Sequence, residues 1–181
     1  MINSKHIRNQ FPSLDRLVNN EKIIYLDGPA GTQVPQTVID GISDYYKKSN
    51  ANIHGEFITS KETDKIMNST RNKLALLLGA ENESCISIGQ NMTSLSFSLA
   101  HAFSRAFNPG DEVIITELDH EANRGPWKIL EDVGVIIKEV NLLDNGVLDY
   151  KDFKNKITNK TVLITMGMSS NAFGTLNDFK R

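Results

Sequence analysis

The chain is organised around the stretch Thr116-Glu-Leu-Asp-His-Glu-Ala-Asn-Arg-Gly-Pro-Trp127. An apolar run, Glu112-Val-Ile-Ile115, precedes it and is typical of a buried strand, and a helical pattern follows from Trp127. The stretch therefore lies at the carboxyl end of a strand, where open α/β sheets bind ligands. A histidine in that place, His120, can hydrogen-bond, transfer a proton or stack on a flat ring. Taken alone, it is more often a surface histidine in an acidic turn.

Strand and helix patterns alternate through the rest of the chain. This alternation predicts an α/β fold with a mostly parallel sheet and helices on both faces. The sheet looks incomplete, because the chain stops after a buried-looking strand at the start of what should be a covering helix. The expected strands are 23–26, 85–88, 112–116, 135–140 and 161–165, and the expected helices are 35–49, 61–78, one from the 89–94 loop to about 107, 122–133 and 150–156.

The composition is that of an ordinary globular protein. The chain has 181 residues, 39% of them hydrophobic, and a net charge of −2, which gives no bulk attraction for nucleic acid or anionic membranes. No secretion signal or membrane-spanning run is recognised, so a cytoplasmic location is expected. The single cysteine, Cys85, excludes a disulfide framework and is expected to be a small buried hydrophobe.

A second chemical feature is the loop Gly89-Gln-Asn-Met-Thr-Ser94, which leads into a helix. The first turn of a helix has unpaired backbone N–H groups and the positive end of the dipole, and Thr93 and Ser94 add hydroxyls. The loop could therefore bind a phosphate. An ordinary cap, with Asn91 or Thr93 capping and nothing bound, is an equally good interpretation. The loop is neither a Walker loop nor a dinucleotide fingerprint.

Asn171 follows the last expected strand, on the same edge of the sheet as the His120 and Thr93 loops. That edge thus offers a phosphate site, a flat imidazole and an amide. Pyridoxal phosphate is a flat, phosphorylated, hydrogen-bonding cofactor that would use all three. Alone, Asn171 would more often be a turn residue that bonds its own backbone.

The remaining acidic and histidine residues give weaker indications of a functional site. The acidic group Glu117, Asp119 and Glu121 could hold paired catalytic carboxylates, although a solvated loop fits it better. The histidines are too far apart and too irregularly spaced for a local metal motif, so no metal is expected.

These motifs, in this order, resemble the class V aminotransferase family of pyridoxal-phosphate enzymes, and most of all its cysteine desulfurase-like branch. The resemblance extends from about Ile23 onward and implies the transferase-like fold known as fold type I. It is carried by Tyr25-Leu-Asp-Gly-Pro-Ala-Gly-Thr-Gln-Val-Pro35, Asn50-Ala-Asn-Ile-His54, Asn91-Met-Thr-Ser-Leu95, Pro109-Gly-Asp-Glu-Val-Ile-Ile-Thr-Glu-Leu-Asp-His-Glu-Ala-Asn123 and Ser170-Asn-Ala-Phe-Gly174.

The resemblance implies roles for the cofactor residues. His120 matches the histidine that stacks on the cofactor ring and assists proton transfer. Asn91, Met92 and Thr93 match the turn that cradles the phosphate, and Asn171 matches the asparagine that bonds the phenolic oxygen of the ring. The desulfurases carry two threonines in this turn, so Met92 implies one hydroxyl contact fewer.

The resemblance also implies an organisation. Ala30 and His54 match segments on the substrate side. Residues 1–60 would form part of the small domain with its substrate-side loops, and residues 61–181 would form the first half of the large cofactor-binding domain. The complete enzyme would be a homodimer that acts on an amino acid through an aldimine.

Family members are longer than this chain. The Schiff-base lysine, the aspartate on the pyridine nitrogen, the sulfur-accepting cysteine and the substrate-carboxylate arginine would all lie beyond its end, and Lys180 is too early to be that lysine. We therefore expect the chain alone to be inactive. Two alternatives stay open: an inactive remnant or interaction module, and a lyase, epimerase or transaminase of the same fold.

Overall fold

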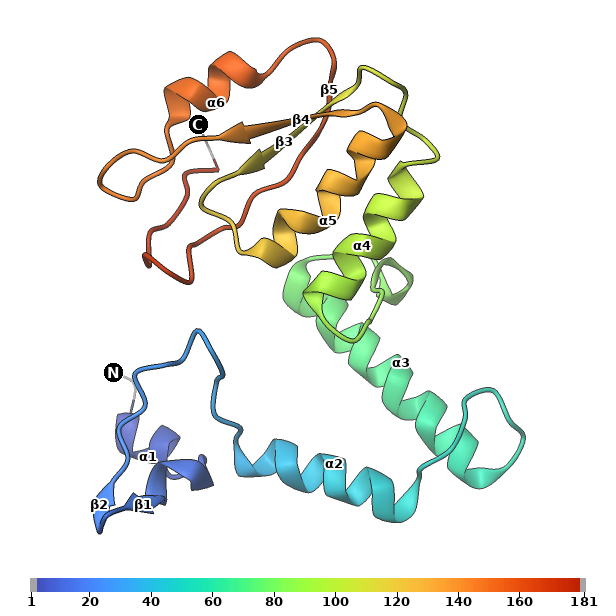
Figure 1. Ribbon diagram of the computed structural model, residues 1–181. Coiled ribbons are helices and arrows are strands. Elements are labelled where there is room, and N and C mark those ends of the chain that lie inside the picture. Colours follow the sequence, from blue (N-terminus) through green and yellow to red (C-terminus); the bar gives the residue numbers. More distant parts are fainter. Residues whose placement is uncertain (1–2, 180–181) are drawn as a thin grey trace. The chain divides into compact units, whose positions relative to one another are not determined.

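The computed structural model describes residues 3–179 and divides into two compact units (Figure 1). The first unit ends at Ser87, and the second begins at Ile88. The first contains α1 (Ser4–Arg8), η1 (Pro12–Asp15), β1 (Leu17–Val18), β2 (Glu21–Lys22), α2 (Gln36–Lys48), α3 (Ile58–Leu78) and η2 (Glu83–Cys85), where η marks a 3-10 helix. The second contains α4 (Met92–Phe103), β3 (Glu112–Thr116), η3 (Glu121–Asn123), α5 (Gly125–Lys128), η4 (Ile129–Val133), β4 (Ile136–Val140), α6 (Tyr150–Lys156) and β5 (Thr161–Ile164).

The two long helices of the first unit confirm the sequence prediction. Pro35 is the residue before α2, where its fixed φ and missing N–H are harmless, and Ser49 ends that helix. Gly79 ends α3 in the left-handed region, at φ 67°, which an L-residue with a β carbon adopts less readily. In the part of the chain that the structure describes, no helix is both long and apolar enough to cross a bilayer, and that includes the 21-residue α3.

Two expected strands are absent from the described residues. Residues 23–26 are a loop after the β1–β2 hairpin, and of residues 85–88 the first, Cys85, ends η2 while 86–88 continue as a loop that joins no sheet. The sequence has the apolar run that a strand needs, but a strand also requires a hydrogen-bonded neighbour, which a local pattern does not specify. Cys85 is exposed, so its expected burial is also wrong.

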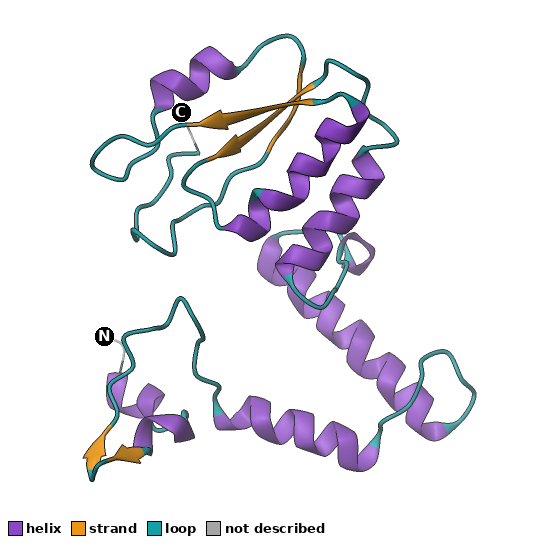
Figure 2. Ribbon diagram, viewed as in Figure 1, coloured by secondary structure: helices purple, strands orange, loops and turns teal. Residues whose placement is uncertain are grey.

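The second unit is built on a three-stranded parallel sheet of order β4-β3-β5 (Figure 2). The expected strands 112–116, 135–140 and 161–165 are confirmed within one residue. All five residues of the central strand β3 are buried, as the apolar run predicts for a strand covered on both faces.

Helices cover both faces of this sheet, as expected (Figure 1). Val113 and Ile115 face one way and pack with Trp127 and residues of α4 in one core. Ile114 faces the other way and packs with Leu148 and residues of α6 in a second core. Side chains that alternate along one strand therefore anchor the two layers.

The expected helix over 122–133 is broken into three short pieces, η3, α5 and η4. Gly125 and Pro126 lie at the first break, where proline cannot donate a backbone hydrogen bond. Trp127, Leu130 and Val133 have the spacing of one helix face, but only Trp127 and Leu130 are buried and Val133 is exposed.

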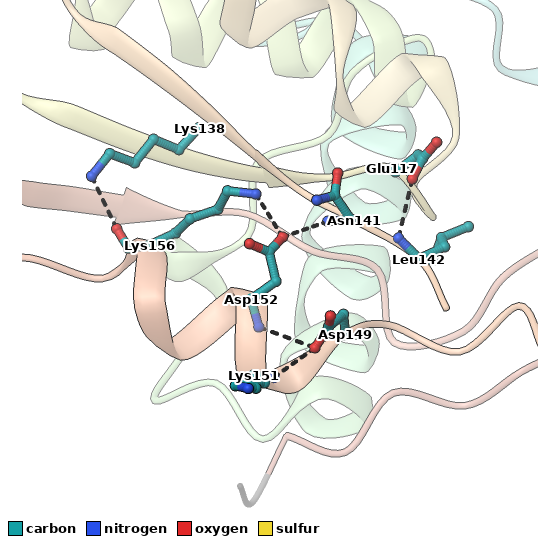
Figure 3. Close-up of polar contacts among 8 residues, drawn as sticks. All are labelled: Glu117, Lys138, Asn141, Leu142, Asp149, Lys151, Asp152 and Lys156. Carbon is teal, nitrogen blue, oxygen red and sulfur yellow. Dashed lines mark hydrogen bonds and ion pairs between the residues drawn. The ribbon is translucent and has the colours of Figure 1, made fainter. Parts of the chain in front are cut away.

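A polar network holds α6 against the end of β4 (Figure 3). Asp149 Oδ1 accepts hydrogen bonds from the backbone N–H groups of Lys151 and Asp152, at 2.9 and 3.0 Å, and so caps the helix. Asp152 Oδ2 accepts from the backbone N–H of Asn141 at 2.9 Å and from Lys156 Nζ at 2.6 Å. The hydrogen bond from the Asn141 N–H, with a smaller effect from Lys156, holds the pKa of Asp152 below its ordinary value.

Candidate active site

The carboxyl ends of β3, β4 and β5 lie at one edge of the sheet, because the strands are parallel. His120 comes shortly after β3, and Asn171 lies in the segment after β5. Helix α4 packs beside η3 and α5, and α4 and α5 begin at the same end of the unit (Figure 1). The segments that carry His120 and Asn171 therefore leave the same edge of the sheet, and α4 begins at that end of the unit.

The imidazole of His120 has a defined hydrogen bond. Its Nδ1 accepts from the backbone N–H of Ala122 at 3.1 Å and caps η3. In the neutral ring the proton is then on Nε2, which has no hydrogen-bond partner among residues 3–179. The side chain is exposed, so a ligand can reach both Nε2 and the face of the ring.

The first turn of α4 is capped by Asn91, one of the two residues expected to do so. Asn91 Oδ1 accepts from the backbone N–H of Ser94 at 2.9 Å, and its carbonyl accepts from Leu95 at 3.1 Å. Within the described chain, the backbone N–H groups of Met92 and Thr93 have no partner, and neither has the Thr93 hydroxyl. Three donors are therefore free at the positive end of a 12-residue helix, which suits an anion.

Asn171 lies at the tip of a hairpin-like loop. The loop is closed by backbone hydrogen bonds from Ser170 to Thr175, at 2.9 Å, and from Asn177 to Met168, at 3.0 Å. Ser170 is buried, and its hydroxyl accepts from the backbone N–H groups of residues 172 and 173. Ser170 thus makes the turn contacts that Asn171 could have made, and the exposed Asn171 amide has no partner among the described residues.

The acidic group beside His120 is not simply a solvated loop. Asp119 Oδ2 accepts from the Thr116 hydroxyl at 2.6 Å. Its Oδ1 accepts from the backbone N–H of Gly167 at 2.6 Å and from Asn123 Nδ2 at 3.2 Å. Neither Asn123 nor Gly167 was predicted from the sequence as a site residue. The i, i+4 spacing of Asp119, Asn123 and Trp127 was the only local signal.

The two candidate substrate-side residues, Ala30 and His54, belong to the first unit. The backbone N–H of Ala30 donates to the carbonyl of Asp27 at 2.8 Å and closes a turn. His54 has φ 66°, and its backbone N–H donates to the Asp64 carboxylate at 3.1 Å. Its imidazole is 80% exposed, and Nδ1 lies 3.4 Å from Asp64 Oδ1.

No group of three or more His, Cys, Asp and Glu side chains within residues 3–179 is arranged to hold a metal ion. His120, Asn171 and the first turn of α4 offer an imidazole, an amide and a helix terminus, which together suit an organic anion with a flat ring.

Comparison with known proteins identifies the family. The model of the aminotransferase class-V family matches residues 24–181. The chain belongs to this family, which confirms the resemblance carried by the five motifs.

The relatives it matches place it in the cysteine desulfurase-like branch. A cysteine desulfurase of Serratia proteamaculans is 35% identical over 176 residues, which is 96% of this chain and 43% of that protein. A "Probable cysteine desulfurase" of Halobacterium salinarum is 32% identical over 180 residues, 97% of this chain and 43% of that protein. The chain thus spans less than half the length of these relatives and corresponds to their amino-terminal portion.

Solved structures agree with this assignment. The cysteine desulfurase CsdA from Escherichia coli superposes with a TM-score of 0.82 at 25% identity, covering 98% of this chain and 44% of that one. The apo cysteine desulfurase from Thermococcus onnurineus NA1 gives 0.84 at 25% identity, covering 97% and 42%. A more distant fold neighbour, at 19% identity and a TM-score of 0.67 over 87% of this chain and 39% of that one, is a C-DES mutant with glycine covalently linked to the PLP-cofactor. The expected fold class is confirmed.

Proposed function

We propose that this chain binds pyridoxal phosphate as the amino-terminal portion of a cysteine desulfurase-type enzyme whose substrate is an amino acid, cysteine. One observation carries the proposal: α4, in which the Met92 and Thr93 N–H groups are free, begins at the end of the unit where the chain leaves β3 toward His120. The names of the relatives support the reaction type, and the free donors at the site support the choice of residues.

The residues present fit the phosphate of this cofactor. A phosphate needs several donors that converge near a positive partial charge, and the N–H groups of Met92 and Thr93 with the Thr93 hydroxyl provide them. Asn91 does not need to contact the phosphate, since its side chain already holds the first turn in place. The hydroxyl that the desulfurases carry at the position of Met92 is missing, so fewer contacts are expected.

When it is bound, pyridoxal phosphate supplies an electron sink for chemistry at the α carbon of an amino acid. His120 would lie against the flat ring and hold a proton at Nε2, because Nδ1 is engaged by Ala122. The free amide of Asn171 would donate to the phenolic oxygen of the ring.

The remaining assignments follow from family membership and are part of the same proposal. Ala30 and His54 would contribute to the substrate side, with residues 1–60 in the small domain and residues 61–181 in the cofactor-binding domain. The complete enzyme would be a cytoplasmic homodimer. The Schiff-base lysine is assigned to a segment outside this chain, so binding rather than turnover is the property to test.

The test is binding of pyridoxamine phosphate, which lacks the aldehyde and so cannot attach to surface lysines. In NMR titrations of the 181-residue chain, we expect shifts at the Met92 and Thr93 amides and at the His120 imidazole. Thr93→Ala should weaken binding about tenfold, because it removes a hydrogen bond to a charged group. Ser98→Ala is the matched control, because its hydroxyl donates to the carbonyl of Ser94 inside the same helix.

Pyridoxamine without the phosphate separates the outcomes. Equal shifts with and without the phosphate, or shifts that spread over both units, would contradict the proposal. Absence of binding at millimolar ligand would instead support the inactive-remnant interpretation.

A further inference from the structure

We propose that Asp119 is a positioning residue that locks the loop of His120 to the loop of Asn171. The inference rests on the proposed function for its chemical meaning, but its structural content concerns this chain alone. The carboxylate would fix the relative placement of the two groups assigned to the cofactor ring, without touching the cofactor itself.

Hydrogen-bond donors surround the carboxylate of Asp119. The carboxylate accepts from a hydroxyl on its own strand end, Thr116, which is fully buried. It also accepts from the backbone N–H of Gly167, 48 residues further along the chain, at 2.6 Å. Every group that contacts Asp119 is a donor, so the side chain acts as an acceptor between the segments that follow β3 and β5.

Gly167 lies at the base of the Asn171 loop. The carbonyl of Gly167 accepts from Asn177 Nδ2 at 2.7 Å, and Asn177 also closes the loop through its backbone. Gly167 therefore binds Asp119 through its N–H group and the far side of the hairpin-like loop through its carbonyl. A β carbon at Gly167 would lie 2.8 Å from Asp119 Oδ1, so the close approach requires glycine.

Asn123, four residues after Asp119, also joins the segments that follow β3 and β5. Its Nδ2 donates to Asp119, and its Oδ1 accepts from the Thr165 hydroxyl at 2.8 Å and from Trp127 Nε1 at 3.1 Å. Thr165 directly follows β5, so a second side chain joins the same two segments. Because Asn123 and Trp127 are buried, this connection is shielded from water.

The two neighbouring acids serve other contacts, which makes the role of Asp119 specific. Glu117 Oε2 accepts from the backbone N–H of Leu142, in the segment after β4, at 3.1 Å (Figure 3). Glu121 pairs with Arg124 at 3.7 Å, and its carboxylate is largely exposed. Of the three acids, only Asp119 reaches the Asn171 loop.

The experiment measures amide hydrogen exchange by NMR in the 181-residue chain without ligand. For Asp119→Ala we expect at least tenfold faster exchange at Gly167 and Asn177, together with loss of the fixed Nδ1-acceptor tautomer in the ¹⁵N spectrum of His120. Asp119→Asn should restore both, since the amide oxygen can face Gly167 while the amide nitrogen faces the Thr116 hydroxyl. Glu121→Gln is the matched control and should change neither.

Unchanged exchange at Gly167 and Asn177 in Asp119→Ala would overturn the inference, as would a failure of Asp119→Asn to restore it. If Asp119→Ala does not fold, Gly167→Ala tests the same contact from the other segment and should give the same two changes. Pyridoxamine phosphate binding is measured separately. If the Asp119 variants change hydrogen exchange as expected but the chain does not bind this ligand, the proposed function is refuted and the role of Asp119 in joining the two loops stands.

Discussion

The buried hydrogen bond between Asn123 and Trp127 gives a quantitative test of the site. Asn123 is 7% exposed and Trp127 5%, and the indole N–H donates to Asn123 Oδ1 at 3.1 Å. Asn123→Ala leaves that N–H without a partner in a dry environment, at a cost of about 1–3 kcal/mol. It also removes the hydrogen bonds with Thr165 and Asp119, so the expected loss of stability is about 3 kcal/mol.

Trp127→Phe tests the same hydrogen bond by removing its donor. It removes the N–H together with part of a large side chain, while Asn123 Oδ1 keeps the hydroxyl of Thr165. The expected cost is about 2 kcal/mol, divided between one hydrogen bond and lost packing. In the double variant no indole N–H is stranded, so the two costs should fall short of additivity by about 1–2 kcal/mol.

The assay is urea unfolding followed by far-ultraviolet circular dichroism, because Trp127 is the only tryptophan and fluorescence would not serve its variants. The control pairs Asn123→Ala with Phe153→Leu. Phe153 packs in the core on the other face of the sheet, so that pair should be additive within about 0.5 kcal/mol. A coupling below about 0.5 kcal/mol for Asn123 and Trp127 would refute the hydrogen-bond argument.

Three further predictions concern the helix ends and pH. Met92→Thr should raise the affinity for pyridoxamine phosphate about tenfold by supplying a hydroxyl beside the free amides, as NMR titration would measure. Asn91→Ala should cost about 1 kcal/mol in urea unfolding, whereas Asn91→Asp should cost little. Asp152→Asn should lower stability at neutral pH, because the Asn141 N–H and then Lys156 keep the pKa of Asp152 low. That stabilisation is present above about pH 4 and is lost as pH falls through the lowered pKa, so the two urea midpoints should converge in acid.

Local sequence patterns were sufficient where the structure is local. The continuous apolar run of β3 predicted a buried strand, and the expected helix over 61–78 ends where α3 ends, before Gly79, since each signal acts over a few residues. The apolar run at 85–88 was misleading, because its strand character depended on a neighbour that the run does not encode. The same limit applies to residues 23–26.

The site divides in the same way. Asn91 could be predicted as a helix cap from its position, which the structure confirms, whereas His120 and Asn171 stay predictions from the motifs around them. Asp119 could not be distinguished from its acidic neighbours, because its defining contact is with Gly167, far along the chain. Residues that bind each other across two loops leave little periodic signal for sequence analysis to use.

The central strand β3 has a further consequence for engineering and for natural variation. Val113 and Ile115 point into one layer and Ile114 into the other, and Thr116 begins the segment that carries His120. Deleting one residue from β3 would exchange the side chains between the layers and rotate the emerging loop to the opposite face. Insertions and deletions in β3 should therefore be far more damaging than conservative replacements. Deep mutational scanning should find that residues 112–116 tolerate conservative substitutions but not a change in the length of the strand.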